Sequence, residues 1–353
     1  MHVLFYLGFT PEFAGLGSEK IAEVMGFQSW VAARLSKQLL ILKKQPILYI
    51  HPELRKYEKI DEFLKFIETS GGILIAGESD SDFESTLSMY DVKACVIAHG
   101  MWAINVQYLC RRNCVNVLLY DAGGFRRGEQ VFVDPIGVVG FSSLNGFRKT
   151  GSIRDDQLEE ISNLQDIESG SRPVDYPYVL VLLDHSGSFF YPFDTSFNNP
   201  ANLISSISKR FPKKMFAVRT HPGDPFQKDI ELPKNFISAN DGSIGQWSQY
   251  CDCAIGFASK ALWMPMLFGK PVVVVARGLM NFFKPLRHVL YESRVIDQLS
   301  IDSIVNSFDR DSVREFIGNV AIDHHLMISS DTSRSINKNL KSVLYRRILL
   351  GQH

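Results

Sequence analysis

Two apolar runs in the second half of the chain are each followed by side chains that could bind phosphate. The run Met215–Val218 leads into Arg219–Asp224, which holds an arginine and a histidine, and the run Cys253–Phe257 leads into a serine and a lysine. Guanidinium, imidazole, hydroxyl and ammonium groups all neutralise or hydrogen-bond a phosphate oxygen. These residues predict a site for a phosphate-bearing ligand, with the members Arg219, His221, Pro222, Gly256, Ser259 and Lys260.

The apolar runs themselves predict buried strands of a parallel sheet. Met215–Val218, Cys253–Phe257 and Val272–Val275 are short and continuous, and a helical run, Ala261–Phe268, separates the last two. In open α/β sheets, ligands bind outside the carboxyl ends of the strands. A helix start beside Ser259 would add free N–H groups and the positive end of a dipole. We therefore expect the phosphate site at this edge of the sheet.

The first half of the chain also alternates apolar runs with helical stretches. Its runs predict five further strands, at Val3–Leu7, Gln45–Ile50, Gly72–Gly77, Ala94–His99 and Val115–Tyr120. This alternation is typical of βαβ units and a parallel sheet. His99 and Asp121 would then lie at the carboxyl ends of neighbouring strands. Turn formation before Gly123 and Gly124 is the alternative role for Asp121.

A further stretch with candidate ligand groups is Asp134–Ser143. It combines an acid, two glycines and the paired hydroxyls of Ser142 and Ser143, with no basic residue. Turn formation alone does not require two serines beside Gly140, so a turn and a ligand-binding role are both open.

The length of 353 residues predicts two domains, because single hydrophobic cores stop growing at roughly 250–300 residues. We expect a first domain at residues 1–150, a polar linker at 151–177 and a second domain at 178–330. An amphipathic, basic helix is expected within 331–353, packed back on the first domain. Contact with a membrane surface is the alternative role of that helix.

Composition argues against several classes of protein. Lysine plus arginine and aspartate plus glutamate number 38 each, so no overall field attracts nucleic acid or an anionic membrane. The five cysteines contain no CxxC pair, which argues against a disulfide framework or zinc site and favours reduced thiols in the cytoplasm. The chain has no basic region before its first apolar run and no apolar stretch of about 18 residues. Neither a signal peptide nor a membrane span is therefore expected.

One acidic triplet, Asp80-Ser81-Asp82, has the spacing of a metal-binding DxD motif. It follows the Gly72–Gly77 run within an acidic segment. An exposed loop or a helix start is the expected structure, because acids are enriched in the first turn of helices. A metal site at a strand end is the alternative.

Two α/β domains, with hydroxyls and a histidine at the strand ends of the second, are similar to the GT-B glycosyltransferase architecture. In detail, the chain resembles the capsule polysaccharide biosynthesis family, which includes bacterial Kdo transferases that use CMP-Kdo. The resemblance covers patches of residues 94–280. The segments that carry it are Asp134–Leu144, Tyr178–Asp184, Arg219–Asp224, Gly256–Ser259 and Phe268–Val272.

This resemblance implies an α/β, GT-B-like fold with two Rossmann-like parallel-sheet domains facing a central cleft. The first domain would bind the acceptor and the second would bind the nucleotide-sugar donor. His221 would lie near the donor phosphate, where Arg219 could assist it, and Ser259 would face the nucleotide. Ser142, Ser143 or Lys260 would bind the carboxylate of a keto sugar acid.

Several acids are candidates for the catalytic carboxylate. Asp121 matches an acidic residue of the family, with one extra residue in the loop that follows. The family's second acid position holds Ser188 here, and Asp184 or Asp194 could take its place. A carboxylate would stabilise the oxocarbenium-like centre, and Asp121 or His99 would accept the proton of the acceptor hydroxyl. The catalytic set is accordingly Asp121, Asp184 and His221.

The resemblance also implies the partners. The donor would be a CMP-activated sugar, and the acceptor an oligosaccharide or glycolipid in bacterial surface polysaccharide synthesis, in the cytoplasm or at the inner face of the membrane. CMP leaves without a diphosphate, so the reaction requires neither a metal nor a cofactor. Three alternatives are a transferase with a UDP or CDP donor, a degenerate GT-B domain that binds a glycan or a partner enzyme, and a GT-B epimerase acting on a UDP-sugar.

Overall fold

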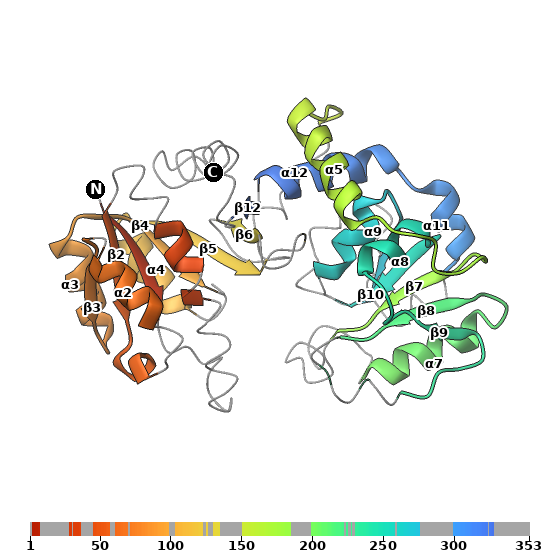
Figure 1. Ribbon diagram of the computed structural model, residues 1–353, viewed down its shortest axis with the longest axis horizontal. Helices are drawn as coiled ribbons and strands as arrows, with labels where there is room; N and C mark the ends of the chain where they lie inside the picture. The colour runs from red at the N-terminus through yellow and green to blue at the C-terminus, as the bar shows by residue number, and fades with distance from the viewer. Residues whose placement is uncertain are drawn as a thin grey trace. The chain divides into compact units, whose positions relative to one another are not determined.

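The structure of the protein is a computed structural model. It describes residues 2–7, 28–29, 31–36, 45–56, 61–69, 71–98, 103–122, 125, 130–134, 150–184, 199–221, 224, 227, 230–257, 260–275, 299–323 and 325–327. The chain forms two compact units. Unit 1 comprises Met1–Val138 and Asp323–His353, and unit 2 comprises Val139–Ile322. Each unit is built on one sheet (Figure 1).

The sheet of unit 1 has seven strands in the order β12-β6-β5-β4-β1-β2-β3. Strands β1 to β5 are parallel, and β6 and β12 add an antiparallel edge. The parallel part has the order 3-2-1-4-5 of a Rossmann sheet. The strands are β1 (His2–Leu7), β2 (Gln45–Ile50), β3 (Ile73–Ala76), β4 (Val92–Ala98), β5 (Asn116–Ala122), β6 (Gln130–Asp134) and β12 (His325–Met327).

Helical segments connect the parallel strands of unit 1. Residues 28–29 and 31–36, between β1 and β2, are helical, and the later connections carry η2 (Pro52–Lys56), α2 (Asp61–Thr69), α3 (Asp80–Met89) and α4 (Ile104–Arg112). Helix α3 begins where Ser79 accepts a hydrogen bond from the N–H of Asp82, while the Asp82 carboxylate accepts one from the N–H of Ser79. This capping box satisfies two of the N–H groups that a helix start leaves open. Phe83 and Leu87 of α3 and Leu109 of α4 are buried in one apolar cluster with β1, β2, β4 and β5.

The sheet of unit 2 has five parallel strands in the order β11-β10-β7-β8-β9. Counted within the unit, this is again the order 3-2-1-4-5. The strands are β7 (Val179–Leu182), β8 (Phe216–Arg219), β9 (Phe236–Ser238), β10 (Cys253–Gly256) and β11 (Val272–Val274). The first three residues of β8 and all residues of β7, β10 and β11 are buried, as expected for a sheet covered on both faces.

Helices cover both faces of the second sheet, because right-handed crossovers on either side of β7 run in opposite directions. The helices described in this unit are α5 (Asp155–Glu168), α7 (Pro200–Arg210), α8 (Ile244–Tyr250), η7 (Lys260–Leu262), α9 (Trp263–Leu267), α11 (Ile301–Ser307) and α12 (Arg310–Asp323). Helices α5, α8 and α9 contact one another, and α7 lies beside β8 and β9 (Figure 1).

The segment that the sequence predicted as a linker, 151–177, is part of unit 2. It carries α5, whose Ile161 and Leu164 are buried. The segment is held at its start by the buried carboxylate of Glu315 on α12, which accepts hydrogen bonds from the Thr150 N–H at 2.6 Å and the Gly151 N–H at 3.1 Å. The polar residues of this segment therefore belong to the exposed face of a helix that packs within unit 2.

The α/β class and the two Rossmann-like parallel sheets expected from the sequence are confirmed. The sequence of Asp311–Met327 also predicts a helix over that segment, and this prediction is wrong in its last turn, because α12 ends at Asp323 and β12 follows. The reason is pairing with β6, which buries His325 against the rings of Phe125 and Phe132.

The helix predicted within 331–353 lies outside the described residues. Among the helices that the structure describes, none is both long and apolar enough to cross a membrane. Of the five cysteines, four are buried and Cys114 is exposed, and all five are free thiols. Burial raises the pKa of the Cys251 thiol to about 12.

Candidate functional site

The strands of unit 2 end at one level, which places their following residues along one edge. Leu182 of β7 pairs with Arg219 of β8 and with Gly256 of β10, and Gly256 pairs with Val274 of β11. Adjacent strands lie about 4.8 Å apart. The polar residues that follow β7, β8 and β10 are therefore gathered within a few strand spacings.

Three of the predicted site residues lie on this edge. Asp184 follows β7, His221 follows β8 and Lys260 opens η7 after β10, and each is half-buried. Because the strand order reverses between β7 and β10, the crevice of this sheet opens at that point. Asp184 and Lys260 belong to the two strands that flank the crevice, and His221 belongs to the next strand.

A buried amide, Gln227, joins the loops that carry Asp184 and His221. Its Nε2 donates to the Asp184 carbonyl at 2.5 Å, and its Oε1 accepts from the His221 N–H at 2.7 Å. Its side chain is only 2% exposed, so both bonds form away from water and are costly to break. Sequence reasoning did not select Gln227, because its partner at Asp184 is 43 positions away.

Arg219 extends from the end of β8 toward the loop after β9. Its Nη1 donates to the carbonyls of Ala239 at 2.6 Å and Gly242 at 3.1 Å. The adjacent Thr220 N–H and hydroxyl both donate to the Asn240 side-chain carbonyl, at 3.0 and 3.1 Å. These bonds fix the loops after β8 and β9 to each other, and they direct part of the Arg219 guanidinium toward protein carbonyls.

Gly256 permits the close approach of η7 to the end of β7. A Cβ at this position would lie 2.9 Å from the Leu262 side chain and 3.0 Å from the Leu182 carbonyl. Both distances are shorter than ordinary van der Waals contact. The glycine therefore acts through packing, by holding the start of η7, and with it Lys260, against the strand end.

The remaining predicted site residues lie elsewhere or outside the described part. Asp121 is inside β5, where it pairs with Phe132 of β6, because the strand continues two residues beyond the predicted end. Its side chain is not described. His99 and Asp194 also lie outside the described residues, as do four members of the predicted set: Ser142, Ser143, Pro222 and Ser259.

The carboxyl edge of the first sheet has a different character. Tyr6 of β1 stacks on Tyr49 of β2 with ring centroids 5.9 Å apart, and Phe83 of α3 contacts both rings edge-on. Burial, with the nearby charges of Asp82 and Asp80, raises the pKa of Tyr49 to about 12. The carboxyl edge of the first sheet is therefore lined by aromatic rings, and Asp80 and Asp82 lie near them.

The Asp80-Ser81-Asp82 triplet is the start of α3, as the sequence indicated. Asp82 completes the capping box, and hydrogen bonds from Ser79 and from the N–H of Glu78 lower its pKa. The Asp80 carboxylate accepts a hydrogen bond from the Asn105 side chain at 2.9 Å. Within the described ranges, no three His, Cys, Asp or Glu residues cluster closely enough to hold a metal ion.

Comparison with known proteins shows the fold. No protein-family model and no curated protein matches the chain. Among solved structures, the β-Kdo 2,7 transferase KpsC of Thermosulfurimonas dismutans is similar at 13% identity over 80% of this chain and 92% of that one, with a TM-score of 0.52. The fold is the GT-B fold.

Two other GT-B-like structures are similar with lower TM-scores. The β-Kdo 2,4 transferase KpsC of Thermosulfurimonas dismutans has a TM-score of 0.47 at 11% identity, over 70% of this chain and 83% of that one. The UDP-GlcNAc 2-epimerase of Methanocaldococcus jannaschii has a TM-score of 0.40 at 10% identity, over 88% and 94% of the two chains. At these sequence identities, structural similarity supports a statement about the fold of this chain and nothing more.

The edge of the second GT-B sheet offers three kinds of group to a ligand. Lys260 supplies a cation, His221 supplies an imidazole, and Asp184 supplies a carboxylate. A phosphate suits the first two, and a developing positive charge suits the third. This set can bind an anion and stabilise opposite charges on either side of a breaking bond.

Proposed function

We propose that the protein is a glycosyltransferase that moves Kdo, or a related keto sugar acid, from a CMP-activated donor to a glycan acceptor in surface polysaccharide synthesis. The observation that carries this proposal is the gathering of Asp184, His221 and Lys260 at the crevice of the second sheet. The GT-B fold and the resemblance of the Arg219–Asp224 and Gly256–Ser259 runs support it. The names of the similar Kdo transferases agree with the keto sugar.

In the proposed reaction, the bond between the anomeric carbon and the CMP phosphate oxygen breaks, and the electron pair leaves with the phosphate. His221 and Lys260 stabilise the charge that develops on that phosphate. Asp184 stabilises the oxocarbenium-like sugar. The acceptor oxygen then bonds to the anomeric carbon, and its proton passes to a carboxylate, for which Asp121 is our candidate.

The remaining predicted residues have supporting roles in this proposal. Ser142 or Ser143 binds the carboxylate of the donor sugar, and Ser259 and Pro222 contribute to binding the nucleotide. Arg219 positions the loop that carries His221, since its Nη1 bonds hold that loop to the one after β9. The donor is a substrate, and the reaction as proposed needs no cofactor.

A donor panel with three variants tests this function. We expect the protein to release CMP from CMP-Kdo when an oligosaccharide or glycolipid acceptor is present, and to leave UDP-sugars intact. His221→Ala and Lys260→Gln should each lower the rate by about 10²–10³-fold, the usual effect of removing one group that stabilises a transition-state charge. Lys209→Gln, at an exposed position in the last turn of α7, is the matched control.

Each outcome separates one alternative. Release of UDP from a UDP-sugar would replace the donor assignment, and CMP binding without release would indicate a glycan-binding module. An unchanged rate in His221→Ala would remove the imidazole from the mechanism. Circular dichroism on the variants checks that the fold is intact.

A further inference from the structure

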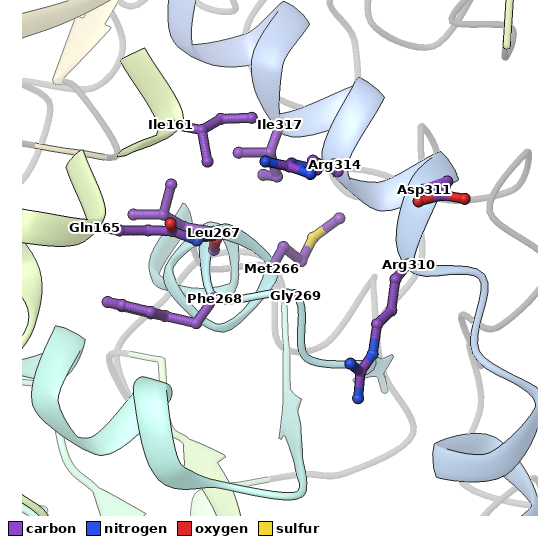
Figure 2. Close-up of a pocket in the computed structure, with 10 residues that line it drawn as sticks. All are labelled: Ile161, Gln165, Met266, Leu267, Phe268, Gly269, Arg310, Asp311, Arg314 and Ile317. Carbon is purple, nitrogen blue, oxygen red and sulfur yellow. Dashed lines mark hydrogen bonds between the residues drawn. The ribbon is translucent and has the colours of Figure 1, made fainter. Parts of the chain in front are cut away.

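Unit 2 has a second candidate site, a pocket of about 240 Å³ between α5, the end of α9 and the start of α12 (Figure 2). Its walls are Ile161 and Gln165 of α5, Met266–Gly269, and Arg310, Asp311, Arg314 and Ile317 of α12. All of these residues belong to one unit, so the pocket is formed within a single packed body.

The pocket is separate from the candidate donor site. Helix α9 follows η7, which starts at the carboxyl edge of the sheet, and it ends at Leu267. Phe268 and Gly269 then lead back into β11, which begins at Val272. Since β11 is parallel to β10, this end of α9 lies near the amino ends of the strands, opposite the edge that carries Lys260.

The floor of the pocket is apolar. Ile161, Met266, Leu267 and Ile317 are buried, and Figure 2 shows Ile161 and Met266 pointing into the hollow. Protein interiors are normally filled to the density of organic crystals. A hollow bounded by aliphatic side chains and one thioether therefore has room for a small apolar group, which would gain dispersion contacts with walls that are already shielded from water.

The rim of the pocket is cationic. Arg310 and Arg314 are four positions apart on α12, so they share one face of the helix. Both are exposed, and within the described part of the chain neither guanidinium makes a hydrogen bond or an ion pair. In Figure 2, the Arg314 guanidinium lies beside Ile317, the Arg310 side chain extends from the same helix away from Arg314, and Asp311 points away from the apolar side chains.

Attraction to the carboxyl end of α9 is a purely structural explanation for these arginines. The last carbonyls of that helix are however already engaged. The Met264, Pro265 and Met266 carbonyls accept from the N–H groups of Phe268, Gly269 and Lys270, and the Leu267 carbonyl accepts from Gln165 Nε2 at 2.6 Å. The donors of Arg310 and Arg314 thus remain available to a ligand.

We propose that this pocket binds a small organic anion, with its oxyanion head on Arg314, Arg310 one helical turn away as a second cation, and a short apolar body against Ile161, Met266 and Ile317. The volume of about 240 Å³ is below the usual range for drug-sized ligands, about 300–1,000 Å³, so the body is limited to about one ring. Guanidinium groups bind carboxylate and phosphate heads with the same forked geometry. This inference is independent of the proposed transferase reaction.

Titrations of the full chain, observed through the ¹³C-methyl signal of Met266, test the proposal. The probes are phenyl phosphate, benzoate, inorganic phosphate and neutral benzyl alcohol. We expect phenyl phosphate or benzoate to shift this signal saturably, and the stronger of the two identifies the head group. Inorganic phosphate and benzyl alcohol should bind at least about tenfold more weakly, because the first lacks the apolar ring and the second lacks the anionic head.

Charge variants of opposite sign complete the test. The double variant Arg310→Gln/Arg314→Gln should weaken phenyl phosphate binding by at least about tenfold, and Asp311→Asn should strengthen it slightly, by about twofold. Arg172→Gln, at another exposed arginine of unit 2, is the matched control and should change nothing. The proposal fails if benzyl alcohol binds as well as phenyl phosphate, if the Met266 signal does not respond to either anion, or if the double variant binds as the wild type does.

Discussion

The parallel parts of the two sheets have the same strand order but different chemistry at their carboxyl edges. The first edge is built on the interlocked rings of Tyr6, Tyr49 and Phe83, beside the exposed acids at the start of α3. The second carries the cation Lys260 and the imidazole His221, with the buried amide Gln227 beneath. A Rossmann-like order sets where a ligand can bind, and the residues just after the strands decide which ligand it is.

The two edges are also held in place by different interactions. Packing of aromatic rings fixes the first, and hydrogen bonds between loops fix the second. A substitution that adds side-chain volume should therefore destabilise the first edge most. A substitution that removes a hydrogen-bonding group should destabilise the second edge most. The following changes test this contrast unit by unit, through amide hydrogen exchange measured on peptides from each sheet.

Gly77→Ala is expected to have the largest effect. A Cβ at this position would overlap the hydroxyl and ring of Tyr49, and that ring cannot move freely because Tyr6 and Phe83 contact it. Overpacking of this kind costs typically about 1–3 kcal/mol, and here we expect the upper end. Exchange should accelerate in β1–β3 and stay unchanged in β7–β11. Equal acceleration in both sheets would contradict the contrast.

Gln227→Leu should have the next largest effect, confined to unit 2. It leaves the Asp184 carbonyl and the His221 N–H without their buried partner, which costs about 2 kcal/mol. We expect faster exchange after β7 and β8 and a weaker affinity for CMP in calorimetry, by roughly tenfold. Thr86→Val, a polar-to-apolar change at a buried position of unit 1, is the control for CMP affinity. If Gln227→Leu binds CMP normally, the amide has no role in shaping the site.

Gly256→Ala should destabilise less than Gly77→Ala. Its Cβ would meet the flexible end of Leu262 at 2.9 Å and the Leu182 carbonyl at 3.0 Å, so partial relaxation is available and the cost should be about 1 kcal/mol. Urea unfolding, followed by exchange in β7 and β10, measures it. A cost above that of Gly77→Ala would mean that packing controls the second edge as strongly as the first.

At neutral pH the smallest effect, close to zero, comes from the ionisation of Tyr49, which acts only in alkali. Because the folded-state pKa of Tyr49 is raised to about 12, the neutral phenol favours the folded state. This contribution is fully present below the ordinary pKa of 10 and is lost as pH rises from 10 through 12. Wild-type stability to urea should therefore fall relative to Tyr49→Phe across this window. A constant difference between the two proteins from pH 9 to 12 would contradict the assignment.

The sequence predicted the long central strands well, because burial on both faces leaves a continuous apolar run. Strand β2 has the predicted bounds, Gln45–Ile50, and β1 differs from its prediction by one residue, at its start. Strands β6, β9 and β12 were not predicted. Strand β9 has only three residues, and β12 follows a helical pattern that pairing with β6 overrides.

The candidate site could be predicted only in part, for a related reason. The types of Asp184, His221 and Lys260, and their places after apolar runs, are visible along the chain. Gln227 is not, since its two hydrogen bonds depend on how the loops after β7 and β8 meet. The sequence likewise predicted that Arg219 binds phosphate. Its hydrogen bonds to the Ala239 and Gly242 carbonyls could not be predicted, because they depend on how the loop after β9 lies beside β8.

The short run from Lys260 to Leu267 has one end at the crevice of the second sheet and the other at the pocket beside α12. Only η7 and α9 lie between them, and Trp263 and Met264 are buried throughout. Such a tightly held segment passes a displacement at one end to the other. If both ends bind ligands, their affinities are coupled, and thermodynamic reciprocity requires that each ligand changes the binding of the other by the same factor.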